Sequence, residues 1–160
     1  MHIESARMLE EGVPHSESIP WMMRNLPDMG WQNGVVVIDG MRHPDEYESM
    51  KELFPSSILV FCDCPEDEVI RRICGRDKVT QEEAKKFLGN QAEEDRREFF
   101  MSKADFIITP ETNLKEVAKQ IGLLLKSNGD SLVIGASGRM GAGKSTFAKA
   151  LKEYLSQEEK

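Results

Sequence analysis

Short, uninterrupted apolar runs divide this chain at regular intervals. Four of them, rich in β-branched residues, cover residues 35–39, 58–62, 105–108 and 132–134. Continuous apolarity, rather than alternation of apolar and polar residues, is typical of strands in a parallel sheet that is covered on both faces. The pattern therefore predicts four buried, parallel strands.

The segments between these runs carry apolar residues at helical spacing. Helices are expected over residues 44–53, from 65 onwards, and over 80–101, 113–126 and 144–157, with two less regular ones over 4–11 and 19–25. Pro44 suits a first helical turn, and Thr80 followed by Glu83 forms a capping-box pattern. Strands that alternate with helices predict one α/β domain over residues 1–160, with a doubly wound parallel sheet and helices on both faces.

Composition and charge exclude several function classes. The formal net charge of −7 argues against a nucleic-acid partner, which normally requires a basic face, although a few placed arginines can still bind a small anion. No apolar run approaches the roughly 20 residues of a membrane span. Cys62, Cys64 and Cys74 are too few and too irregularly spaced for a disulfide framework or a zinc site. These features predict a cytoplasmic protein without a membrane or nucleic-acid partner.

A glycine-rich segment carries the strongest chemical signal. Residues 138–146 read Gly-Arg-Met-Gly-Ala-Gly-Lys-Ser-Thr, which satisfies the Walker A pattern, and they lie between an apolar strand and an amphipathic helix. Glycines let successive amide groups turn toward phosphate oxygens, and the following helix directs its positive end at the same oxygens. We therefore expect a nucleoside triphosphate to bind at Gly138, Gly141, Ala142, Gly143, Lys144, Ser145 and Thr146. Lys144 would also stabilise charge during catalysis, and Ser145 would be a Mg²⁺ ligand.

Two further groups of residues are candidates for the same site. Asp39 ends an apolar strand, where ligands of α/β folds bind, so it is expected to hold Mg²⁺ or to accept a proton. Arg42 is expected to bind an acidic group of the acceptor substrate. Arg72 and Arg76 lie four residues apart on one helical face and are expected to stabilise charge on the transferred phosphoryl group. Arg96 and Arg97 are weaker candidates for that role, since a solvated charged helix would explain them equally well.

With these residues in place, the chain resembles the dephospho-CoA kinase and nucleoside monophosphate kinase group of P-loop kinases. The segment 135–146 is similar to the dephospho-CoA kinase opening, Gly-x-Thr-Gly-Gly-Ile-Gly-Ser-Gly-Lys-Ser-Thr. Residues 72–108 are similar to that family's lid and last strand, with Arg-x-x-x-Arg-Asp, the pair Gln91-Ala92 and the pair Ala104-Asp105. The element Asp39-Gly40-x-Arg42 is more similar to nucleoside monophosphate kinases, in which such an arginine holds the acceptor phosphate. The resemblance implies ATP and Mg²⁺ as cofactors.

The order of these elements departs from that family, in which the P-loop comes first. Here it comes last, which indicates a circular permutation joined through residues 127–130. A permuted domain predicts that the strand at 132–134 lies between those at 35–39 and 58–62. The family's acidic motif, Asp-x-Asp-x-x-Ala-Arg, is matched only by Ala6-Arg7, because Met1 and Ile3 stand where its acids would be.

These patterns predict an ATP-dependent small-molecule kinase, similar to dephospho-CoA kinase. A nucleoside monophosphate or deoxynucleotide kinase is the alternative that Asp39 and Arg42 favour. A nucleotide-binding module without catalysis is the alternative that the missing acidic motif favours. A GTPase switch is disfavoured, because the sequence has no Asn-Lys-x-Asp guanine-specificity element.

Overall fold

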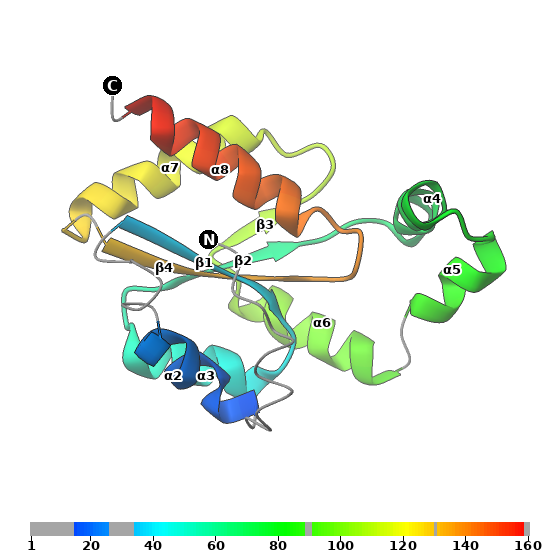
Figure 1. Ribbon diagram of the computed structural model, residues 1–160, viewed down its shortest axis with the longest axis horizontal. Helices are drawn as coiled ribbons and strands as arrows, with labels where there is room; N and C mark the ends of the chain where they lie inside the picture. Colours follow the sequence, from blue (N-terminus) through cyan, green and yellow to red (C-terminus); the bar gives the residue numbers. More distant parts are fainter. Residues whose placement is uncertain (1–14, 26–33, 89–90, 130, 159–160) are drawn as a thin grey trace.

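The computed structural model describes residues 15–25, 34–88, 91–129 and 131–158 (Figure 1). In chain order its elements are α2 (His15–Asn25), β1 (Gly34–Met41), α3 (Pro44–Leu53), β2 (Ile58–Cys62), α4 (Glu66–Asp77), α5 (Gln81–Phe87), α6 (Gln91–Lys103), β3 (Phe106–Ile108), α7 (Leu114–Ser127), β4 (Ser131–Gly138) and α8 (Lys144–Glu158). The helix expected over 4–11 and the pair Ala6-Arg7 lie outside the described residues.

The four strands form one parallel sheet in the order β1-β4-β2-β3. The last strand in the sequence is therefore internal, with β1 on one side and β2 on the other. The predicted position of this strand, between those at 35–39 and 58–62, is confirmed. The carboxyl ends of all four strands consequently meet at one edge of the sheet, which is where ligands of open α/β sheets bind.

Helices cover both faces of this sheet, as predicted. Figure 1 shows α7 and α8 on one face and α2, α3 and α6 on the other. Each face has its own apolar core: Phe147 and Ile121 belong to the first, Phe61 and Met50 to the second, and all four side chains are at most 2% exposed. Helices α4 and α5 project past the carboxyl edge of the strands (Figure 1). None of the helices described is long and apolar enough to cross a membrane.

Local signals explain most of the element boundaries. Pro44 opens α3, and the Glu46 carboxylate accepts hydrogen bonds from the backbone amides of Arg42 and His43. Thr80 caps α5 through the predicted capping box with Glu83. These side chains satisfy backbone amides that a helix leaves without an internal partner.

The helix predicted over residues 80–101 is wrong in one respect, because it is divided into α5 and α6. Leu88 follows Phe87 with extended backbone (φ −88°, ψ 121°) and ends α5. The sequence continues with Gly89 and Asn90, which have low helix propensity and often follow helix ends. The spacing of charged residues predicted one continuous helix, but the low helix propensity of these two residues explains the division.

The strands also differ in length from their apolar runs. Strand β4 extends from Ser131 to Gly138, well beyond residues 132–134, because small residues continue the ladder where the apolar run ends. Strand β1 continues past Asp39 to Met41, with an irregularity at Gly40, whose φ is +85°. An extra residue of this kind changes the direction of nearby side chains. Asp39 is therefore close to the end of its strand rather than at it.

Candidate functional site

The loop between β4 and α8 requires glycine at three positions. Gly138, Gly141 and Gly143 have φ values of +137°, +78° and +111°, a region that side chains with a Cβ atom rarely adopt. Gly138 also packs against the end of β2, where a Cβ atom would lie 2.3 Å from the carbonyl oxygen of Cys62. The glycine spacing of the Walker A pattern is thus a backbone requirement of this loop.

Lys144, the first residue of α8, folds back over the loop. Its Nζ donates to the carbonyl oxygens of Gly138 at 2.7 Å and of Arg139 at 2.9 Å. The ammonium group is therefore held at the amino-terminal end of a fifteen-residue helix, whose dipole is positive there. Helix end and ammonium group together place positive charge at this loop, which favours a negatively charged ligand.

Two oxygen-bearing side chains lie beside the loop. The Ser145 hydroxyl lies 3.5 Å from the Oδ2 atom of Asp39, although the two residues are 106 positions apart in the sequence. Parallel pairing of β1 with β4 causes this proximity, since Asp39 is in register with Ala136. Hydroxyl and carboxylate oxygens suit Mg²⁺, which proteins bind through one or two carboxylates together with substrate phosphates. Ser145 and Asp39 therefore fit the metal role predicted for them.

A cleft of about 460 Å³ lies over the loop. Among the residues that line it are Arg42, Arg72 and Arg76, and the loop that follows β3, around Thr109 and Pro110. The fold thus brings the predicted arginines to the predicted phosphate loop. The cleft is also lined by Met140, Gly141, Ala142, Gly143, Lys144, Ser145 and Thr146.

Helix α4 positions two arginines above this cleft. Arg72 donates through Nη1 to the carbonyl oxygen of Gly141 at 3.1 Å and through Nε to Glu68 at 2.8 Å. Arg76 contacts the Met140 sulfur through Nη2 at 3.2 Å and pairs with Asp77. Hydrogen bonds from Arg71 and then from Arg72 lower the pKa of Glu68 to about 2, so this carboxylate stays ionised. Hydrogen bonds and the contact with Met140 thus hold both arginines at the loop.

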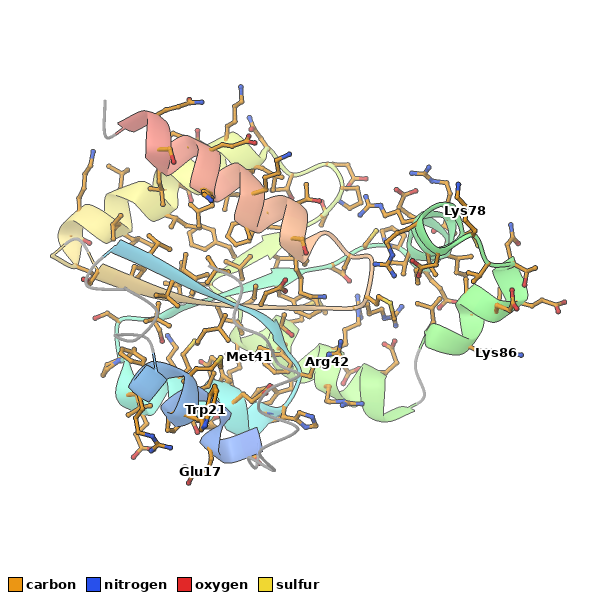
Figure 2. All side chains as sticks on the ribbon, viewed as in Figure 1. Glu17, Trp21, Met41, Arg42, Lys78 and Lys86 are labelled. Atoms are coloured by element: carbon orange, nitrogen blue, oxygen red, sulfur yellow. The ribbon has the colours of Figure 1, made fainter. Side chains whose placement is uncertain are left out.

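A second, smaller cavity of about 110 Å³ adjoins the cleft, and we call it the arginine cavity. Arg42 and Met140 line both spaces, so the two are neighbours. Figure 2 shows Arg42 at the end of β1, close to α6. None of the described residues that line the arginine cavity is acidic. It is lined by four arginines, Arg42, Arg96, Arg97 and Arg139, together with apolar side chains such as Phe61 and Phe100.

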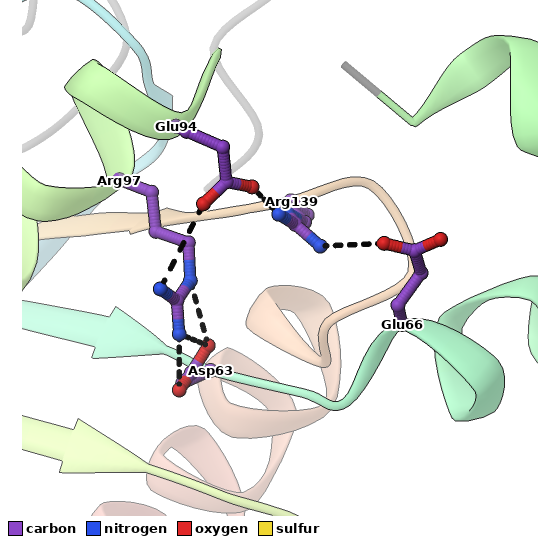
Figure 3. Close-up of polar contacts among 5 residues, drawn as sticks. All are labelled: Asp63, Glu66, Glu94, Arg97 and Arg139. Carbon is purple, nitrogen blue, oxygen red and sulfur yellow. Dashed lines mark hydrogen bonds and ion pairs between the residues drawn. The ribbon is translucent and has the colours of Figure 1, made fainter. Parts of the chain in front are cut away.

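An ion-pair network borders this cavity (Figure 3). Arg97 binds both carboxylate oxygens of Asp63, each at 2.9 Å from Nη2. Arg139 pairs with Glu94 of α6, and its other side lies 3.9 Å from Glu66 of α4. The network therefore joins the loop between β4 and α8 to helices α4 and α6.

Sequence reasoning missed part of this arrangement. It assigned no role to Arg139, Asp63 or Glu94. Asp63 follows the apolar run at 58–62 directly, so the rule that selected Asp39 would have selected it too. Arg139 and Glu94 give no comparable signal, because their pairing depends on how α6 crosses the sheet.

Cys62 lies beneath the loop but is not a nucleophile. Its side chain is buried, and burial raises the pKa of the thiol to about 11, although the charge of Lys144 acts in the opposite direction. The thiol therefore stays protonated at neutral pH, and Cys62 serves to pack β2 against the loop.

Comparison of the chain with known protein families, with curated proteins and with solved structures found no match.

Proposed function

We propose that this protein is a P-loop kinase that transfers the γ-phosphoryl group of ATP to a small molecule, as dephospho-CoA kinases do. The observation that carries the proposal is the position of Lys144. Its ammonium group is held by two loop carbonyls at the start of α8, in a cleft that shares Arg42 and Met140 with a cavity lined by arginines. A donor site and an acceptor site that adjoin are what group transfer requires.

Each residue has a separate role in this proposal. The loop amides and Lys144 bind the β and γ phosphates, while Arg72 and Arg76 neutralise charge on the phosphoryl group as it moves. Bound Mg²⁺ would supply further charge neutralisation, and Ser145 and Asp39 are the residues that would hold it. Arg42, shared by the cleft and the arginine cavity, binds the acceptor on the side facing the γ-phosphate.

The reaction breaks the bond between the γ-phosphorus and the bridging oxygen and forms one to an acceptor oxygen, with ADP as the leaving group. A hydroxyl acceptor, as in dephospho-CoA, also needs a base, and Asp39 is the candidate. A phosphate acceptor, as in nucleoside monophosphates or deoxynucleotides, needs none. The 3.5 Å contact with Ser145 favours metal binding by Asp39 over its use as a base. An acceptor that needs no base, a nucleoside monophosphate or a deoxynucleotide, is therefore the alternative substrate.

A nucleotide-binding module without catalysis is the competing proposal. Coupled ADP release with Mg-ATP, measured alone and with dephospho-CoA or each nucleoside monophosphate, separates the two. A kinase gives turnover that one acceptor stimulates and that Lys144→Ala removes. Binding of ATP without stimulation by any acceptor would favour the module.

A further inference from the structure

Arg139 belongs to the phosphate loop, yet it does not line the cleft over that loop. Its side chain lies between the arginine cavity, which Arg97 also lines, and a pocket on its other side that Asp63 and Glu66 line, and it is only 19% exposed. Its role is therefore to be sought on the acceptor side of the loop rather than on the ATP side.

The partners of Arg139 are all carboxylates from surrounding helices. Glu94 of α6 pairs with one side of the guanidinium group, and Glu66 of α4 lies 3.9 Å from the other. The Nε atom is buried, and none of the described residues accepts a hydrogen bond from it. A buried donor without an acceptor is unfavourable, so a rearrangement that offers Arg139 a better-placed anion would be stabilising.

The cavity beside Arg139 has the character of a site for such an anion. Four arginines line it in a protein whose formal net charge is −7, and the carboxylates that pair with Arg97 and Arg139 do not line it themselves. Its volume of about 110 Å³ compares with the roughly 10–15 Å³ that one water needs. It therefore has room for one phosphate-sized group but not for a whole nucleotide. Guanidinium groups bind phosphate through paired, charge-assisted hydrogen bonds.

We propose that Arg139 binds a phosphate group of the acceptor, and that Glu94 holds its guanidinium group until the acceptor arrives. This inference rests on the proposed function for the identity of the acceptor, but the phosphate site itself does not depend on ATP turnover. Glu94 then competes with the acceptor phosphate for Arg139. Arg97 differs from Arg139, because Asp63 binds it through both carboxylate oxygens and fixes its orientation.

Competition between Glu94 and phosphate for Arg139 predicts opposite effects of two substitutions on phosphate affinity. Replacing Glu94 by Gln removes the competing charge, so phosphate should bind more tightly, by about two- to fivefold for a partly exposed ion pair. Replacing Arg139 by Gln should weaken phosphate binding about tenfold or more, and Arg139→Lys should fall between, because an ammonium group cannot bind bidentately. A merely structural ion pair predicts that both changes lower stability and leave phosphate affinity unchanged.

The test is a calorimetric titration of the full chain with inorganic phosphate. It is done in the Lys144→Ala background, so that phosphate bound at the phosphate loop does not obscure the result; Lys144 does not line the arginine cavity. Glu94→Gln is compared with Glu98→Gln, an exposed residue of the same helix that should leave affinity unchanged. Circular dichroism is used to check that Arg139→Gln folds. The same titration with dephospho-CoA and with nucleoside monophosphates separates a phosphate carried by an acceptor from free phosphate.

Opposite shifts for Glu94→Gln and Arg139→Gln would support the proposal. Absence of phosphate binding in the Lys144→Ala background would overturn it, as would weaker binding on Glu94→Gln or equal binding on Arg139→Gln. The titration uses no ATP. If the chain never releases ADP, the proposed function is contradicted, but the phosphate titration still tests the site at Arg139.

Discussion

Substitution of Gly138 tests most directly whether the loop between β4 and α8 needs glycine for its backbone conformation. Its φ of +137° is strained for any residue with a Cβ atom, which costs about 1–3 kcal/mol. The Cβ atom of Gly138→Ala would also lie 2.3 Å from the Cys62 carbonyl oxygen and 3.2 Å from the Cys62 Cβ. These are atoms of a buried strand rather than the end of a flexible side chain, so relieving the overlap costs a further 1–3 kcal/mol or so.

Gly138→Ala should therefore lower the free energy of unfolding by about 2–6 kcal/mol, a large part of the 5–15 kcal/mol typical of a domain. Urea unfolding followed by circular dichroism measures it. Gly75→Ala is the matched control, because Gly75 lies within α4, has no atom within 4 Å of an added Cβ, and should gain about 0.5–1 kcal/mol. If the free energy of unfolding of Gly138→Ala lies within about 0.5 kcal/mol of the parent value, the strain and overlap assigned to this loop are wrong.

Three other substitutions test the site. Lys144→Ala should weaken ATP binding about tenfold or more in a calorimetric titration, since the ammonium group bonds charged phosphates, whereas Lys119→Ala on the exposed side of α7 should not. Asp39→Asn should lower Mg²⁺-dependent turnover about 10²-fold or more without a comparable loss of stability, and Asp45→Asn, an exposed acid of α3, should leave turnover unchanged. Glu68→Gln should remove an acid-sensitive part of stability, seen in urea midpoints between pH 5 and 2.5 or so.

The sign of the last effect follows from the lowered pKa of Glu68. Its ordinary value is 4.5 and the folded protein lowers it to about 2, so the carboxylate stabilises the fold above pH 4.5 and that contribution is lost as pH falls toward 2. Equal urea midpoints for Glu68→Gln and the parent protein at every pH between 5 and about 2.5 would contradict this role of Glu68. Unchanged ATP affinity in Lys144→Ala, or unchanged turnover in Asp39→Asn, would remove those residues from the site.

The sheet could be predicted because its signals are local and repetitive. Apolar runs without alternation predicted a parallel sheet that is covered on both faces. The Walker A segment follows the last of these runs, so a permuted domain predicted that the strand at 132–134 is internal. Asp39 and Ser145, which are 106 positions apart, could be assigned to one site for this reason alone: neighbouring parallel strands end at the same edge.

Tertiary contacts that give no local pattern could not be predicted in this way. The pairing of Arg139 with Glu94 depends on where α6 crosses the sheet. The arginine cavity depends on four side chains, which come from the residue after β1, from α6 and from the loop between β4 and α8. The division between α5 and α6 escaped notice because charge spacing continued across Gly89, although glycine itself is a helix-ending signal.

The central claim is transfer of a phosphoryl group at the loop around Lys144. Its most direct test incubates the chain with Mg²⁺, γ-¹⁸O-labelled ATP and a mixture of dephospho-CoA and nucleoside monophosphates, and measures the masses of the acceptors. The account predicts that one acceptor gains a labelled phosphoryl group, and that Lys144→Ala prevents the gain while Lys119→Ala does not. Unchanged masses for every acceptor, from a chain that binds ATP, would contradict it and leave a nucleotide-binding module.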